Sequence, residues 1–96
     1  VMNAIEFVKG CGIDVAKRIL NNAIGFGCAE IELFGGKYVF RTDDLKQIVE
    51  AFELVGSWGG IDRTKIKIEY AVKNKNFYVA DMMKCELNLV EQCHES

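Results

Sequence analysis

Residues 28–56 read CAEIELFGGKYVFRTDDLKQIVEAFELVG and contain the clearest structural patterns of the chain. Over 28–34, charged and apolar residues alternate, which is the period of a strand with one buried face. Gly35-Gly36 follows and predicts a two-residue hairpin turn, and 37–41 predicts the returning strand. The first half of the stretch therefore predicts an antiparallel hairpin.

The second half of the stretch predicts the clearest helix in the chain. Thr42 is a suitable N-cap for a helix over 43–55. Its apolar residues recur at helical spacing and form one stripe: Leu45, Ile48, Val49, Phe52 and Val55. Asp43 and Asp44 fall in the first turn, where carboxylates favour the helix dipole, and this explanation is simpler than a paired-carboxylate catalyst. Gly56 ends the helix.

Two shorter helices are expected before the hairpin. Asn3 can cap a helix over 4–9, which the glycines of Gly10–Gly12 then stop. A second helix is predicted over 13–23, because its apolar residues recur on one helical face. Gly25–Gly27 is expected to be the loop that leads into the hairpin.

The segment 61–72 fits two structures. Ile66, Ile68 and Tyr70 alternate with charged residues as in a strand, but the same segment also contains a helical stripe. Residues 12–17 (GIDVAK) match residues 60–65 (GIDRTK), and this internal match favours a helix that begins in the same way twice. We therefore predict a helix over 61–72.

The rest of the second half repeats the strand-then-helix pattern of the first half over a shorter segment. Residues 77–79 predict a short strand, and Asp81 can cap a last helix that runs through Cys93. The chain then contains two half-units, 1–56 and 57–96, joined at a glycine-rich link. From the sequence, a degenerate repeat and a chance match both stay open.

Together these segments predict a single domain over 1–96 of the α+β class. It has a small antiparallel sheet of two or three strands, with four or five helices packed mainly on one face. A chain of 10.8 kDa buries about 65% of its surface on folding, so it forms a core without disulfides or metals. The net charge of −2 argues against a strongly basic or acidic binding protein. No apolar run reaches the roughly 18 residues of a membrane span.

The four cysteines, Cys11, Cys28, Cys85 and Cys93, are most simply buried and reduced thiols. Disulfides and a metal site are the alternatives. A disulfide framework needs a secretory context, and residues 1–9 lack the pattern of a signal peptide. No Cys-x-x-Cys pair supports a metal site. We therefore expect a cytoplasmic protein without a metal or cofactor.

Few residues are available for nucleophilic or acid–base catalysis. The only histidine is His94, near the C-terminal end, and the serines are Ser57 and Ser96. The chain therefore has almost no residues from which a serine–histidine–acid catalytic triad could form. Neither a P-loop nor a dinucleotide-binding glycine motif is present. The sequence predicts that the protein is not an enzyme.

Three features are candidates for binding. The segment 63–75 has a local charge of +4, and its lysines Lys65, Lys67, Lys73 and Lys75 can contact phosphate, although a solvated helix face is the simpler explanation. Trp58 lies in the link between the halves and is either a partner contact or a lid on the core. An open strand edge can pair with a partner or with a second copy of the chain.

Two segments resemble a known group of proteins. Met2–Val8 (MNAIEFV) is similar to the opening of small early-region accessory proteins of lambdoid phages and prophages of enteric bacteria. Residues 45–55 (LKQIVEAFELV), followed by Gly59–Ile61 (GGI), resemble a second segment of that group. The matching positions cover about a quarter of the chain. The resemblance implies a phage protein that binds and modulates a host or defence protein in the bacterial cytoplasm, and it carries over no catalytic residue.

Overall fold

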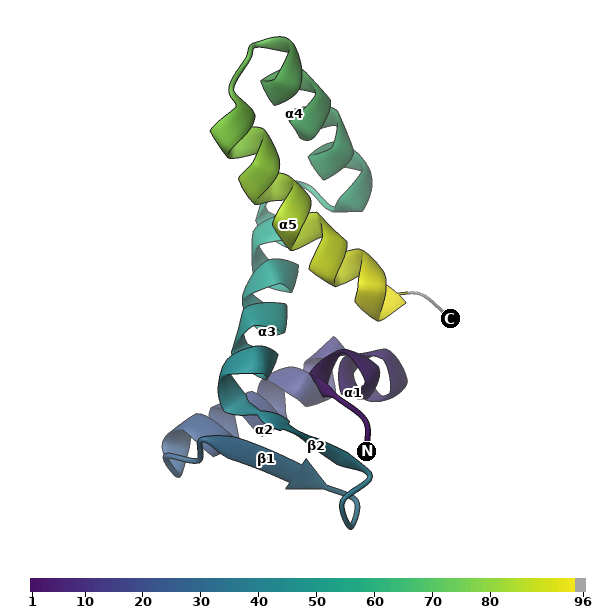
Figure 1. The fold of residues 1–96 in the computed structure, drawn as a ribbon, viewed down its shortest axis with the longest axis vertical. Helices are drawn as coiled ribbons and strands as arrows, with labels where there is room; N and C mark the ends of the chain where they lie inside the picture. The colour runs from purple at the N-terminus through teal and green to yellow at the C-terminus, as the bar shows by residue number, and fades with distance from the viewer. Residues whose placement is uncertain (95–96) are drawn as a thin grey trace.

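A computed structural model describes residues 1–94 as a helical domain with one small sheet (Figure 1). In chain order the elements are α1 (Ala4–Cys11), α2 (Ile13–Gly25), β1 (Glu30–Leu33), β2 (Tyr38–Arg41), α3 (Thr42–Ser57), α4 (Ile61–Lys73) and α5 (Phe77–His94). Five helices and one two-stranded antiparallel sheet in this part of the chain confirm the predicted α+β class. Glu95 and Ser96 lie outside the described residues.

The hairpin forms where it is predicted, but its turn is longer. Leu33 pairs with Tyr38, so the connecting loop spans 34–37. The prediction of a two-residue turn at Gly35-Gly36 is therefore wrong. The two glycines have φ values of 65° and 94°, and Phe34 before them has a φ of 55°. These three left-handed residues reverse the direction of the chain over four residues and not over two.

Thr42 joins the hairpin to α3 in a way that differs from the predicted cap. The N-cap of α3 is Arg41, which makes no side-chain capping bond, and Thr42 is the first helical residue. The Thr42 hydroxyl instead donates a hydrogen bond to the carbonyl of Cys28 over 2.7 Å, and its amide donates to the carbonyl of Ala29 over 3.0 Å. The buried Thr42 therefore fixes the start of β1 against the start of α3.

The first helix begins at its predicted cap, but it runs two residues further than predicted, through Gly10 to Cys11. The Asn3 side chain accepts a hydrogen bond from the amide of Glu6 over 3.0 Å, and the Glu6 carboxylate accepts one from the amide of Asn3 over 3.3 Å. This reciprocal capping box satisfies two amides that the helix leaves unpaired. Gly12 then separates α1 from α2 with a φ of 90° and a ψ of 160°, a region open almost only to glycine.

The helix predicted over 61–72 is confirmed as α4, and its ends repeat those of α2. Gly60 precedes α4 with a φ of 97° and a ψ of −177°, close to the conformation of Gly12 before α2. Both helices are 13 residues long. Each is followed by a left-handed residue, Gly27 after α2 and Lys75 after α4. The internal sequence match thus corresponds to one capped helix used twice.

The predicted strand at 77–79 is wrong, because these residues form the first turn of α5. The helix begins after Asn76, whose carbonyl accepts a hydrogen bond from the amide of Ala80 over 3.1 Å. Asp81, the predicted N-cap, lies inside the helix. The aromatic and β-branched side chains at 77–79 favour a strand locally, but no neighbouring strand exists for them to pair with in the described part of the chain. The second half of the chain is therefore a helical hairpin and not a reduced copy of the first half.

Two groups of buried side chains form the interior of the molecule. Figure 1 shows the elements that carry them, with α1, α2 and the hairpin near the start of α3 and with α4 and α5 beside its end. The first, which we call the N-terminal core, brings α1, α2, the hairpin and the start of α3 together around Phe7, Leu45 and Phe40. The second, the C-terminal core, packs the end of α3 against α4 and α5 and includes Leu87. Phe52 and Leu89 contact both cores. The molecule is elongated, with extents of 48 × 29 × 19 Å.

Candidate interaction surface

Trp58 lies directly after α3 and covers the C-terminal core. Its side chain is half-buried and packs against this cluster of buried residues. Gly59 and Gly60 follow with φ values of 101° and 97° and turn the chain back into α4. Trp58 therefore acts as a lid on the core, which is one of the two roles expected for it.

The basic residues of 63–75 do not gather on one face. The amine of Lys65 lies 3.7 Å from the carboxylate of Glu91 on α5, as the only ion pair among the described residues. Lys67 lies on a different side of α4, where it lines a shallow hollow with Arg63 and Ile66. Lys73 is in the last turn of α4, where a cation favours the helix dipole, and Lys75 is in the turn that follows. The local charge of +4 is thus divided among three places.

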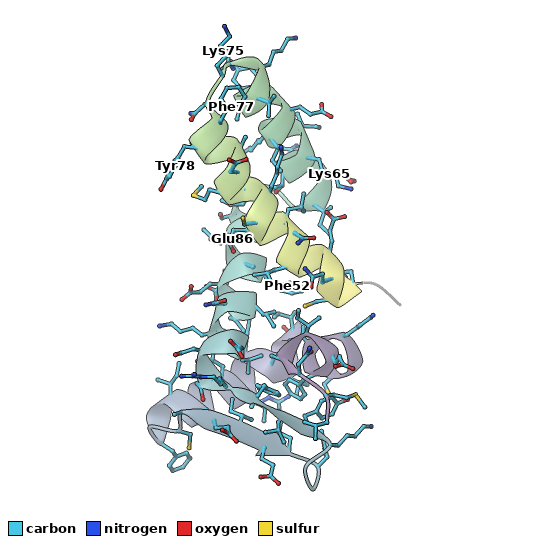
Figure 2. All side chains as sticks on the ribbon, viewed as in Figure 1. Phe52, Lys65, Lys75, Phe77, Tyr78 and Glu86 are labelled. Carbon is cyan, nitrogen blue, oxygen red and sulfur yellow. The ribbon has the colours of Figure 1, made fainter. Side chains whose placement is uncertain are left out.

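A strip of exposed apolar side chains runs along α5 instead. It consists of Tyr78, Met82, Cys85 and Leu89, spaced four, three and four residues apart, which places them on one helical face. Tyr78 is 82% exposed, Met82 is 42% exposed, and Cys85 is also exposed. Only Leu89 is half-buried. We call these four residues the α5 strip, and Figure 2 shows Tyr78 and Lys65 on opposite sides of the α4–α5 hairpin.

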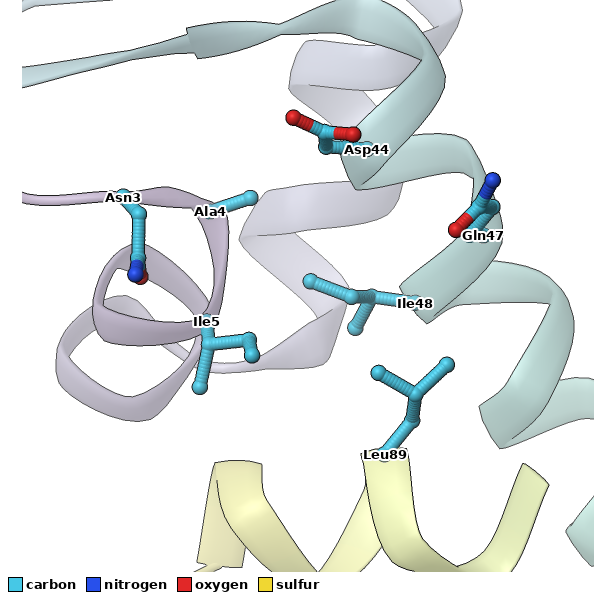
Figure 3. Close-up of a pocket in the computed structure, with 7 residues that line it drawn as sticks. All are labelled: Asn3, Ala4, Ile5, Asp44, Gln47, Ile48 and Leu89. Carbon is cyan, nitrogen blue, oxygen red and sulfur yellow. The ribbon is translucent and has the colours of Figure 1, made fainter. Parts of the chain in front are cut away.

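The α5 strip ends at a pocket between α1, α3 and α5 (Figure 3). Its volume is about 200 Å³, and it is lined by Asn3, Ala4, Ile5, Asp44, Gln47, Ile48 and Leu89. Ile5, Ile48 and Leu89 point toward the same space from three different helices, while the polar groups of Asp44 and Gln47 come from α3. We call this the central pocket. It combines an apolar floor with one carboxylate and two amides.

The sequence alone does not indicate the α5 strip, because its local pattern predicts a strand where α5 begins. In a strand, Tyr78 and Met82 belong to different elements and share no face. The spacing of 78, 82, 85 and 89 becomes visible only when the helix begins at Phe77. The signal that could have shown this is Asn76, a good N-cap residue directly before the segment.

The free edge of β1 is shorter than the sequence suggested. β1 spans only Glu30–Leu33 and pairs with β2 on one side. Glu30 and Glu32 on this strand are exposed, and charged side chains on a short edge strand oppose pairing with another strand. The outer side of β2 is partly covered, because Met2 exchanges backbone hydrogen bonds with Lys37 and Val39. The sheet edge is therefore a weaker candidate for association than α5.

The four cysteines are all free thiols, but they differ in exposure. Cys93 is buried, as predicted, and Cys11 is half-buried. Cys28 and Cys85 are exposed, so the prediction of burial is wrong for these two. Burial raises the pKa of the Cys93 thiol above its usual value of 9.0, and the charge of Lys9 partly opposes this rise. No group of three or more metal-ligating side chains occurs in residues 1–94.

This difference predicts the order of thiol alkylation. At about pH 8 we expect iodoacetamide to modify Cys28 and Cys85 at least about ten times faster than Cys93, because the thiolate is the reactive form and Cys93 is both buried and mostly protonated. The rates are measured by mass spectrometry of peptides from the intact fold, with a denatured sample as control. Equal rates for Cys85 and Cys93 would contradict the burial of the end of α5.

The raised pKa of Cys93 also predicts how the stability of the fold depends on pH. The contribution of Cys93 to stability is complete below pH 9.0 and is lost as the pH rises through the folded pKa.

No family model, curated protein or solved structure matches this chain. Of the helices in the described residues, none has the length and apolar character needed to cross a membrane.

Proposed function

We propose that this chain is a non-enzymatic domain that binds another protein through the α5 strip. The observation that carries the proposal is the strip itself: Tyr78, Met82 and Cys85 lie exposed on a helix whose opposite side carries buried residues of the C-terminal core. Exposed apolar side chains that form one continuous surface, rather than scattered positions, are typical of interaction sites. Tyr and Met are also enriched in the central parts of protein interfaces.

The exposed area of the chain supports the same proposal. Its accessible surface is 6325 Å², whereas a compact monomer of 10.8 kDa exposes roughly 5,500 Å². The elongated shape of the molecule accounts for such an excess, and the added surface leaves room for the roughly 800 Å² that each partner contributes to a standard interface. The resemblance to phage early-region proteins adds the expectation that the partner is a host or defence protein in the bacterial cytoplasm.

Nucleic-acid binding is the second candidate, and the exposed side of α4 favours it. Arg63, Lys67 and Tyr70 are spaced four and three residues apart, so they share one exposed face that can combine phosphate contacts with base stacking. Ile66 lies exposed beside them. Phosphate contacts would make binding fall steeply as salt concentration rises, whereas an apolar protein contact would change much less. Titration of the chain with single-stranded DNA at two salt concentrations therefore distinguishes the two candidates.

The exposed thiol of Cys85 allows a direct test of the proposed function. With Cys11 and Cys28 changed to Ser, a benzophenone maleimide attached to Cys85 places a photo-reactive group in the middle of the α5 strip. Irradiation in an enteric bacterial lysate should cross-link the chain to a discrete protein, identified by mass spectrometry. We expect the Met82→Glu variant to give about tenfold less of this cross-linked product, because the new carboxylate would lose its bound water in an apolar contact.

The control uses the same chemistry on a distant surface. In the chain with Cys11→Ser and Cys85→Ser, the label is attached to the exposed Cys28 before β1, far from α5 in sequence and outside the α5 strip. This form should not give the same product. Cross-linking of the same protein from both positions, or of nothing from Cys85, would contradict binding through the α5 strip.

A further inference from the structure

We propose that the partner surface is a basic amphipathic helix, which lies along the α5 strip and inserts one aliphatic side chain into the central pocket. This inference rests on the proposed function and names the kind of partner. Three observations carry it: the size of the pocket, the spacing of the strip and the charges beside both.

The pocket has the size of one side chain. Its volume of about 200 Å³ lies below the roughly 300–1,000 Å³ of sites for small-molecule ligands. An apolar cavity of about 150 Å³ accommodates a benzene molecule. A single leucine, isoleucine or methionine side chain therefore fits against Ile5, Ile48 and Leu89, whereas a metabolite of ordinary size does not. An anchor residue in a small pocket is the usual central element of a protein interface.

The spacing of the strip fits a helix better than an extended peptide. Apolar residues at intervals of four, three and four residues form a straight row along α5. A second helix presents the same intervals on its own apolar face, so the two rows can interdigitate along their length. The hairpin of α4 and α5 is packed on its inner side around Leu87 and Met83. On the row itself Tyr78, Met82 and Cys85 are exposed, and Leu89 at its end packs against both cores.

Carboxylates lie next to the α5 strip and the central pocket. Asp44 lines the central pocket, and Glu86 lies on α5 between Met82 and Leu89, at spacings of four and three residues. Asp81 lies beside Tyr78 and Cys85 by the same spacing rule. The lysine of α5, Lys84, is spaced four residues from the buried Ala80 and so lies on another side of the helix. Lys9, one turn along α1 from Ile5 and near Cys93, places a cation on the same side, but the three carboxylates outnumber it. The strip and the pocket thus favour lysine or arginine on the partner helix.

Two synthetic peptides test this inference. Each is about 15 residues long, near the length at which an isolated helix forms, and carries leucines spaced four, three and four residues apart. One has lysines at the remaining surface positions and the other has glutamates. Their affinity for the full chain is measured by fluorescence anisotropy. We expect the lysine peptide to bind at least about tenfold more tightly, and replacement of one central leucine by alanine to weaken it by about 30-fold.

Matched double variants locate the contact. Tyr78→Ser with Met82→Ser should weaken the lysine peptide by at least about tenfold. Ile66→Ser with Tyr70→Ser, which changes two exposed apolar residues on α4, should leave its affinity unchanged. Asp44→Asn should reduce the preference for lysine over glutamate by a few-fold. Equal binding of the two peptides, binding of neither, an equal loss in the α4 variant, or self-association of the chain that removes the binding would overturn the inference. A protein cross-linked at Cys85 would still stand as support for the proposed function in each of these cases.

Discussion

Phe7→Ala is expected to lower the free energy of unfolding by about 3–5 kcal/mol, the usual cost of removing a buried aromatic ring. Phe7 is 1% exposed, and its ring centroid lies 5.3 Å from that of Tyr38 and 5.4 Å from that of Phe40. The substitution therefore removes a ring that joins α1 to the hairpin and leaves a cavity inside the N-terminal core. Because a domain of this size has a total stability of about 5–15 kcal/mol, the variant should lose a large part of it. Urea unfolding, followed by far-UV circular dichroism and by Trp58 fluorescence, measures the change.

Trp58 makes this experiment informative about the whole chain. It is the only tryptophan and packs on the C-terminal core, so its fluorescence reports on the end of the molecule that does not contain Phe7. Phe52 and Leu89 contact both cores. This shared packing predicts that the two cores unfold together in one transition. Phe26→Ala is the matched control, because Phe26 is 85% exposed and its loss should change stability by less than about 0.5 kcal/mol. A Trp58 transition that does not move in Phe7→Ala would mean that the two cores unfold independently.

The parts of the fold that the sequence predicts are those with a long, regular pattern. The apolar stripe from Leu45 to Val55 predicts α3 correctly. Each residue of the stripe packs in or against one of the two cores, so its helical spacing reflects burial. The match of residues 12–17 with 60–65 predicts the start of α4, and the structure shows why glycine opens both segments: few other residues adopt its positive φ. The start of α5 is different. Three residues with strand propensity do not form a strand when no neighbouring strand completes the hydrogen bonds, and this depends on the arrangement of the whole chain.

The candidate surface is less predictable for a related reason. A basic segment is visible in the sequence, but its division among the sides of α4 depends on which side packs against α5. Lys65 meets Glu91 only because the two helices run side by side, and the sequence separation of these residues hides the pairing. The central pocket is assembled from α1, α3 and α5, so its lining residues are dispersed over the chain. Apolar residues such as Met82 carry no sequence mark that separates an exposed position from a buried one.

Leu87→Ala should lower the free energy of unfolding by about 2–5 kcal/mol, because it leaves a cavity in the C-terminal core. Leu87 is 6% exposed and lies in the C-terminal core, where α5 packs against α3 and α4. The same exchange at Leu54, which is 40% exposed on α3, provides the control and should cost much less. Thermal and urea unfolding measure both variants. Equal losses at the two positions would contradict the packing of α5 on α3.

The Leu87 variant also tests whether the α5 strip depends on the core beneath it. Leu87 and Leu89 are two residues apart, so they lie on different sides of the helix, one directed to the core and one to the central pocket. When the inner side loses packing, α5 moves more freely against α3, and the pocket formed by Ile5, Ile48 and Leu89 loses its fixed shape. We therefore expect Leu87→Ala to weaken the lysine peptide even though Leu87 does not line the pocket, with faster hydrogen exchange in α5 as the accompanying measurement. Unchanged peptide affinity together with faster exchange would show that the strip binds independently of the pocket.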